Sequence, residues 1–402
     1  MADPAVTAEE QTVLDRISLQ EITELTRSLI GAAGENPPGG EDATVAVLAE
    51  ACDARELDCT RTEVEPGRAN LAANVAGGPG PGLLLLGHTD VVPIGDGWTV
   101  DPTGGLIRDG RLFGRGSTDM KGGLAACVVA MAALRSAGFP LSGPVELAAV
   151  VDEEETGKGI RHYIAEQDRS HFLGCIVAEP TDLQTIVAAR GDAYLEFTVH
   201  GRAAHSGSPG DGVNAIYGAV ALVADLETWQ HELEHAPHPL VGSPTWSVGQ
   251  IHGGTGTSIV PAECRVLADR RLLPEESIAS VLEAVTKRVA SLRLEERGVT
   301  IDVRDTMDMP GFETPTDHPF VVTTDHALAA AGGPGMPFGG WTAACDGGFV
   351  ARDAGVPVVV LGPGSVADQA HRADESVGLE ELLVASRAYA LAAMRLLHRP
   401  RR

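Results

Sequence analysis

Short apolar stretches that end abruptly in charged or imidazole side chains recur along this chain. The runs LLLLGHTDVVP (83–93), AVVDEEETGKG (149–159) and CIVAEPTD (175–182) each pass from a continuous apolar segment to His, Asp or Glu. Continuous apolar runs of this length are typical of strands buried on both faces, as in a parallel sheet. The carboxyl ends of such strands form the ligand-binding edge of an open α/β sheet. The pattern therefore predicts a site built from several strand ends.

Helical and strand periodicities alternate through the first part of the chain. They predict helices over 14–35, 41–54, 119–138 and 157–167, and strands over 83–87, 145–152 and 175–178. Residues 104–113 are expected to form a hairpin around Asp109-Gly110. This order predicts an α/β domain with a mainly parallel sheet.

The pattern changes near residue 191, where apolar and polar residues begin to alternate. Strands are expected at 194–201, 247–254, 262–271 and 299–305, with helices over 212–229 and 275–292. This β-α-β-β-α-β order predicts an inserted α+β domain of the ferredoxin-like type. The later helices (319–331, 346–354, 379–397) and the strand 356–362 return to the first pattern. The predicted parts are therefore catalytic domain 1–190, inserted domain 191–305 and catalytic domain 306–402.

Composition and charge exclude several classes of protein. The net charge of −26 leaves no basic stripe to neutralise phosphates, which argues against nucleic-acid binding. No apolar run reaches about 18 residues, so no membrane partner is expected. The first residues lack the basic-then-apolar order of a signal peptide, and we expect a cytoplasmic protein. The six cysteines are widely spaced and are expected to be reduced, mostly buried thiols.

Two histidines and several carboxylates carry the candidate chemistry. They are His88, Asp90, Asp119, Glu153, Glu154, Glu179 and His371. Such a set is typical of a site for two divalent metals, which share a bridging carboxylate. Asp90, two residues after His88, can fix the orientation of a metal-ligating imidazole. Adjacent residues at a strand end point in different directions, so one of Glu153 and Glu154 can bind metal while the other acts as a general base.

The order of these motifs resembles a known family. GHTDVVP, GRGSTDMKGG, DEEETGKG, AEPT, GRAAHSGSP and AHRADE match, in sequence, the motifs of the two-zinc peptidases and deacylases. That family includes acetylornithine deacetylase, succinyl-diaminopimelate desuccinylase, aminoacylase-1 and the carboxypeptidase G group. The resemblance extends from about residue 15 to residue 395.

The resemblance implies a role for each residue of the site. It implies that His88, Asp119 and Glu179 hold one metal, and that Asp119, Glu154 and His371 hold the other. Glu153 would be the general base and Asp90 the partner of His88, with a cis peptide bond between Asp119 and Met120. Three consecutive glutamates leave the pair Glu154/Glu155 as an alternative to Glu153/Glu154, although the spacing to Gly159 favours the latter. The two metals are expected to be zinc, with cobalt or manganese as alternatives.

The inserted domain resembles the family's lid and dimerisation domain. By this resemblance the chain forms a homodimer in which His205 reaches the partner's site and stabilises the oxyanion. Arg271 would grip the substrate carboxylate, with Arg270 as its rival. The family usually carries Asn where this chain has Ser258, and the segment 341–349 lies where relatives differ by substrate.

The expected function is hydrolysis of the amide bond of an N-acyl amino acid or short peptide, most similar to acetylornithine deacetylase. A desuccinylase, a dipeptidase or carboxypeptidase of the same mechanism, and an enzyme acting on a carbamoyl or other C–N bond are alternatives. A non-catalytic binding or assembly protein on the same fold is an alternative of another class. The complete ligand set argues against it.

Overall fold

The chain folds into two compact units. The computed structural model describes residues 5–32, 34–235 and 237–398. The first unit comprises 1–187, 313–339 and 349–402, and the second comprises 188–312 together with 340–348. The second unit thus includes a segment, 340–348, that the sequence analysis assigned to the catalytic part.

A mixed, mostly parallel sheet forms the centre of the first unit. Its strand order is β1-β2-β6-β3-β7-β17-β8-β15, with β16 paired to β8. The four central strands are parallel: β6 (Val145–Val150), β3 (Gly82–His88), β7 (Phe172–Val177) and β17 (Val358–Val360). The flanking strands are β1 (Asp58–Glu65), β2 (Arg68–Val75), β8 (Ile186–Ala189), β15 (Phe312–Glu313) and β16 (Gly339–Trp341). The predicted α/β class is confirmed.

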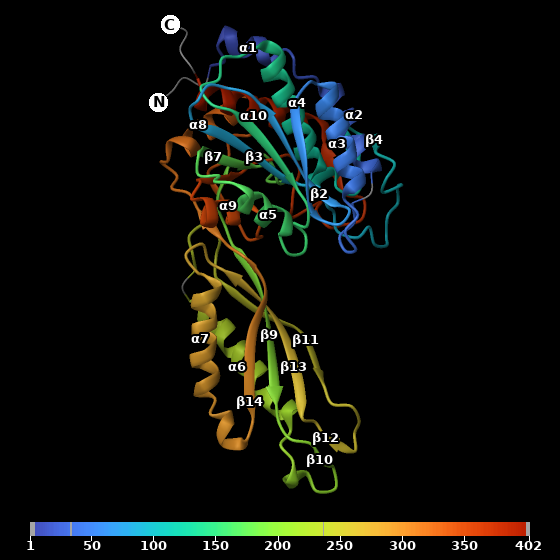
Figure 1. Ribbon diagram of the computed structural model, residues 1–402, viewed down its shortest axis with the longest axis vertical. Helices are drawn as coiled ribbons and strands as arrows, with labels where there is room; N and C mark the ends of the chain where they lie inside the picture. Colours follow the sequence, from blue (N-terminus) through green and yellow to red (C-terminus); the bar gives the residue numbers. More distant parts are fainter. Residues whose placement is uncertain (1–4, 33, 236, 399–402) are drawn as a thin grey trace. The chain divides into compact units, whose positions relative to one another are not determined.

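Helices cover both faces of this sheet (Figure 1). One layer contains α1 (Ala8–Leu14), α2 (Leu19–Gly31), α4 (Gly122–Ala137), α8 (Pro319–Ala330) and α10 (Leu379–Leu396), which pack against one another. Helix α3 (Asp42–Ala54) packs against α2 and β2. The opposite face carries α5 (Lys158–Glu166) and α9 (Gly347–Ala354). Because both faces are covered, strand β3 is buried at every residue, as its apolar run predicted.

Two local predictions are wrong. The helix expected over 14–35 is shorter: α1 ends at Leu14, and α2 spans Leu19–Gly31 after Ser18, whose hydroxyl accepts a hydrogen bond from the backbone N–H of Glu21 (3.4 Å); residue 33 lies outside the described residues. The helix expected to begin at residue 119 is preceded by a π-helical turn, Ser117–Lys121, in which Asp119 leaves the helical conformation. The strands β1 and β2 were not predicted, since DCTRTEVE lacks a clear apolar alternation.

The hairpin expected over 104–113 is confirmed. Strands β4 (Leu106–Arg108) and β5 (Arg111–Phe113) pair antiparallel around Asp109 and Gly110, whose φ angles are 51° and 74°. Positive φ at both central residues is what a two-residue type I′ turn requires. A third strand, β18 (Ser376–Gly378), adds to this small sheet.

One segment, Ser117–Ala137, is long and apolar enough to cross a membrane by length and composition alone, although no such span was expected from the sequence. It contains α4, and 78% of the tested window is buried inside the protein. Burial of this kind is what a core helix of a globular domain shows as well, so the segment is weak evidence for a membrane span.

The second unit has the predicted ferredoxin-like arrangement. Its sheet order is β11-β13-β9-β14, antiparallel throughout. These strands are β9 (Gly191–His200), β11 (Thr245–Gly253), β13 (Glu263–Leu272) and β14 (Thr300–Met309). Helices α6 (Ala215–Leu233) and α7 (Ile278–Ser291) enclose a core that includes Phe197, Leu222 and Val285. A separate two-stranded sheet joins β10 (Ala204–His205) to β12 (Ile259–Val260).

Candidate metal centre

The ends of the parallel strands deliver side chains to one edge of the central sheet. His88 is the last residue of β3, while Glu154 follows β6 and Glu179 follows β7. Register supports the convergence, because His88 pairs with Val150 and Leu86 pairs with Val177 in parallel ladders. His371 lies in the loop between β17 and β18. This is the edge at which open α/β sheets bind ligands.

Asp119 lies between two groups of ligand atoms. On one side, Nε2 of His88 is 3.1 Å from Oδ1 of Asp119 and 3.3 Å from Oε1 of Glu179. On the other, Nε2 of His371 is 3.3 Å from Oδ2 of Asp119 and 3.1 Å from Oε2 of Glu154. Within each triad the candidate ligand atoms lie within 4.8 Å of one another. The structure thus gathers the two triads named from the sequence, and Asp119 belongs to both.

The donor set fits divalent cations. Each triad offers one imidazole nitrogen and two carboxylates, a combination that zinc, cobalt and manganese all accept. His88 and Glu179 are 1% and 3% exposed, so their polar atoms have little water to solvate them. Oε1 of Glu154 is buried and has no hydrogen-bond partner within the described part of the chain. A buried carboxylate oxygen without a donor is costly, and a bound cation would remove that cost.

The groups of this cluster shift one another's pKa values. Burial lowers the pKa of His88, but the carboxylates of Glu179 and Asp119 outweigh burial and bring it well above its ordinary value. Hydrogen bonds to Asp119 and Glu154 raise the pKa of His371 to about 10. Burial raises the pKa of Glu179 to about 7. A divalent cation can replace these protons, since metal ligation requires neutral imidazole and ionised carboxylate.

Asp90 connects His88 to the turn that carries the glutamates. Nδ1 of His88 lies 3.0 Å from the backbone carbonyl oxygen of Asp90 and 3.4 Å from its Oδ1. The backbone N–H groups of Glu153 and Glu154 donate to the two carboxylate oxygens of Asp90, at 3.2 and 3.1 Å. Asp90 is fully buried. The carboxylate therefore orients both the imidazole and the glutamate turn, while Glu155 in the same turn is exposed.

Glu375 is a residue of the site that the sequence analysis did not single out. It is fully buried and accepts hydrogen bonds from the backbone N–H groups of Gly116 (3.1 Å), Thr118 (2.9 Å) and Asp119 (3.0 Å). Arg115 pairs with it at 2.7 Å. This carboxylate fixes the backbone turn that presents Asp119, where the peptide bond to Met120 is cis as the resemblance implied. Its position four residues after His371, within AHRADE, was the only sequence signal.

The other predicted residues belong to the second unit, so the cluster in the first unit is assembled without them. His205 is exposed on β10 and its Nδ1 accepts from the backbone of Gly207 (3.0 Å). Ser258 accepts a hydrogen bond through its backbone carbonyl from Ser206 (3.0 Å), which brings it beside His205 in the β10–β12 pair.

The two candidate arginines differ in accessibility. Arg270 is 1% exposed and paired with Glu276 at 2.6 Å. The side chain of Arg271 is 31% exposed and is held by Asp269 and Asp192, each at 3.1 Å. Burial therefore favours Arg271 over Arg270 as the arginine that an external carboxylate could reach.

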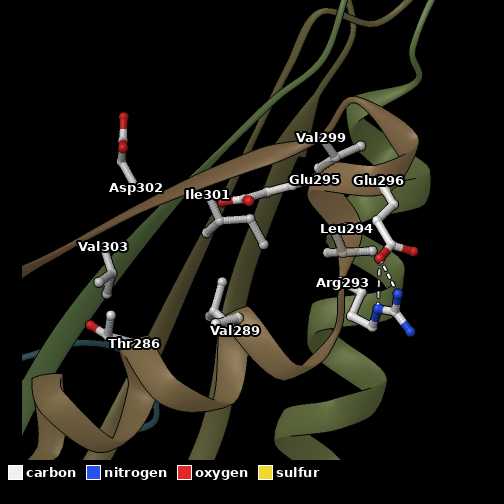
Figure 2. Close-up of a pocket in the computed structure, with 11 residues that line it drawn as sticks. Thr286, Val289, Arg293, Leu294, Glu295, Glu296, Val299, Ile301, Asp302 and Val303 are labelled. Atoms are coloured by element: carbon white, nitrogen blue, oxygen red, sulfur yellow. Dashed lines mark hydrogen bonds and ion pairs between the residues drawn. The ribbon is translucent and has the colours of Figure 1, made fainter.

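A hollow in the second unit lies between α7 and β14, as Figure 2 shows. Its volume is about 380 Å³, and its lining is apolar at Val289, Leu294, Val299 and Ile301. Arg293, at its rim, donates to Glu296 at 2.7 Å, so its charge is already offset. The hollow contains none of the predicted site residues.

Comparison with known proteins identifies the family. The sequence profile described as "Peptidase family M20/M25/M40" matches residues 84–395, more than three quarters of the chain. The chain belongs to peptidase family M20/M25/M40. It is a metal-dependent hydrolase, and its fold is that of the family's catalytic and lid domains.

Individual M20 relatives carry several activities in their names. The chain is 32% identical over 361 residues to a Vibrio vulnificus protein named acetylornithine deacetylase, covering 89% of this chain and 92% of the relative. Aminopeptidase PepT from Bacillus cereus has the same fold, with a TM-score of 0.74 at 22% identity, over 94% of this chain and 99% of that chain. The YXEP protein of Bacillus subtilis is described as a dinuclear metal-binding peptidase; its TM-score is 0.73 at 14% identity, over 94% and 98%. These names support an amidohydrolase and differ in the substrate.

Proposed function

We propose that this M20 hydrolase removes the acyl group from an N-acyl amino acid, with an activity like that of acetylornithine deacetylase. The observation that carries the proposal is the pair of triads that share Asp119, with a glutamate turn held beside them. Relatives named acetylornithine deacetylase, each 32% identical to this chain, support the deacetylase branch. A desuccinylase or a dipeptidase of the same mechanism is the second candidate, because the structural relatives include dipeptidases.

In this proposal His88, Asp119 and Glu179 would hold one divalent ion, and Asp119, Glu154 and His371 the other. The ions, with zinc as the first choice and cobalt or manganese as alternatives, would polarise the scissile carbonyl and acidify the attacking water. Glu153 takes the proton from that water and later gives it to the leaving amine. Asp90 keeps the His88 ring and the Glu153 backbone in fixed orientation, as their hydrogen bonds support.

The second unit contributes substrate recognition in this proposal. Arg271 binds the substrate carboxylate through a charge-assisted hydrogen bond from its guanidinium, whose Nε and Nη2 also donate to Asp269. His205 acts from the partner subunit of a homodimer and donates to the oxyanion. Its exposed position on β10 leaves it available to another chain. The location would be the cytoplasm, where all six cysteines can stay reduced; none of them forms a disulfide bond.

A hydrolysis panel tests the proposal. The purified protein, loaded in turn with zinc, cobalt or manganese, is given N-acetylornithine, N-succinyl-diaminopimelate, an N-formyl amino acid and a dipeptide at equal concentration. The deacetylase proposal expects the highest kcat/KM for N-acetylornithine. A preference for the succinyl substrate or the dipeptide would transfer the assignment to that branch, and no hydrolysis with any metal would favour a binding role.

A further inference from the structure

A buried asparagine lies between two buried carboxylates directly behind the candidate metal centre. Nδ2 of Asn36 donates to Oδ2 of Asp90 at 3.0 Å and to Oδ1 of Asp152 at 3.1 Å. The three residues are 3%, 0% and 2% exposed. An amide nitrogen has two N–H bonds and accepts none, so one amide group can satisfy both carboxylates at once. Because both neighbours are acceptors, the orientation of this amide is fixed.

The two carboxylates that Asn36 joins control the glutamate turn from opposite ends. Asp90 receives the N–H groups of Glu153 and Glu154. Asp152, the residue before Glu153, has a φ of 67°, in the left-handed region where Asp is one of the few tolerated non-glycine residues. Its Oδ2 accepts from the Thr156 hydroxyl, which closes the turn from the other side. Asn36 is therefore the side-chain link between the end of β3 and the start of the turn.

An ion pair supports the Asp152 end of this link. Arg68 donates from one terminal nitrogen to Oδ1 of Asp152 at 2.9 Å, the same oxygen that accepts from Asn36. The guanidinium also forms a bidentate contact with Glu41, whose side chain is fully buried. A buried carboxylate paired in this way is held in one position. The hydrogen-bond chain then runs from Glu41 through Arg68 and Asp152 to Asn36, and on to Asp90.

We propose that Asn36 is a positioning residue of the hydrolase: it holds the 152–154 turn against Asp90 and so sets where Glu153 and Glu154 lie relative to His88. This inference rests on the proposed roles of His88, Glu153 and Glu154. Asn36 touches none of the candidate ligand atoms. Its effect passes through Asp90 and Asp152.

The test compares Asn36→Ala with Asn70→Ala. Asn70 is a matched control because it is also buried (5% exposed) and holds the same loop, donating to the Gly159 carbonyl (2.7 Å) and accepting from the Val151 N–H (3.1 Å). It contacts neither carboxylate of the Asn36 link. Both variants lose two buried hydrogen bonds and should lower the Tm. Only Asn36→Ala should weaken cobalt(II) binding and reduce kcat, each by ~10- to 100-fold as for other residues that orient metal ligands, with KM nearly unchanged.

Two readouts make the outcome decisive. Cobalt(II) titration in competition with a chelator measures metal affinity without turnover, and the visible absorption of the cobalt-loaded protein reports ligand geometry. If Asn36→Ala is insoluble, Asn36→Ser replaces it; its single O–H donor can satisfy one carboxylate only, so an intermediate loss is expected. Cobalt affinity, spectrum and kcat equal to those of Asn70→Ala would overturn the inference. If the wild-type protein hydrolyses no substrate, the proposed function fails, but the cobalt titration still decides the role of Asn36.

Discussion

The site geometry predicts different roles for the adjacent residues Glu153 and Glu154. In Glu153→Ala the backbone N–H that donates to Asp90 remains, so the turn keeps its hydrogen bond and only the side chain is lost. Removing a general base typically reduces the rate by ~10²–10⁴-fold, which corresponds to ~3–5 kcal/mol of transition-state stabilisation. Both metal sites should be retained, because neither triad includes Glu153.

Glu154→Ala should have the opposite pattern. Its carboxylate contacts His371 at 3.1 Å and its other oxygen is buried without a hydrogen-bond partner in the described chain, so its removal deletes one of three ligand groups in the second triad. The variant should lose about one equivalent of metal, and activity with it. The exposed Glu155 provides the control, and Glu155→Ala should keep metal content and kcat within about twofold.

Metal content by atomic emission spectroscopy and kcat are measured on the same preparations of the three variants. Circular dichroism and Tm exclude unfolding as the cause of a loss. Loss of one metal equivalent in Glu153→Ala, with both metals kept in Glu154→Ala, would mean that the two roles are exchanged. Loss of activity in Glu155→Ala alone would refute the assignment and favour the alternative pair.

Four other outcomes are expected. Arg271→Ala should lower kcat/KM for carboxylate substrates by roughly 30- to 1000-fold, with little further loss for the amide analogue. Arg265 is an exposed arginine on the same strand, and Arg265→Ala should change neither kcat/KM value. Equal selectivity for the acid over the amide in both variants would reject the role of Arg271. Mixing inactive His205→Ala with inactive Glu153→Ala should restore part of the activity through hybrid dimers, and a fully active monomer by light scattering would disprove action in trans. Because hydrogen bonds raise the pKa of His371 to about 10, metal affinity should rise about tenfold per pH unit from pH 7 to 9. A metal affinity that does not change with pH would contradict this expectation. In the metal-free protein, the stability contributed by charged His371 should be full below about pH 6.5 and be lost as pH rises through about 10. This is measured as Tm against pH.

The central elements of the fold were predictable because their signals are local. The run LLLLGH is apolar at each position that the sheet buries and turns polar where the strand ends. Alternation after residue 191 likewise predicted strands, and it is clearest in β13, where buried residues alternate with exposed or half-buried ones. Element ends carry weaker signals and were misplaced, as at Ser18, which caps the start of α2 inside the range expected to be helical.

The supporting residues of the site could not be predicted from such patterns. Asn36 and Asp152 are 116 residues apart, and Arg115 and Glu375 are 260 apart, so neither pairing leaves a trace in local periodicity. Each of these residues alone resembles an ordinary polar residue of the surface, which is where its type is most often found. Only folding shows that these groups are buried and that their hydrogen bonds hold the candidate ligands.

Asp119 can belong to both triads only if α4 begins close to the end of β7. Gly123, in the first turn of α4, makes this approach possible: a Cβ atom there would lie 2.1 Å from the carbonyl oxygen of Ala178. Ala178 directly precedes Glu179, so any side chain at 123 would push the helix away from the residue that shares a triad with Asp119. Gly123 in DMKGG therefore serves packing rather than chemistry. Because Gly123 has no side chain, it allows the candidate ligands Asp119 and Glu179 to lie close together.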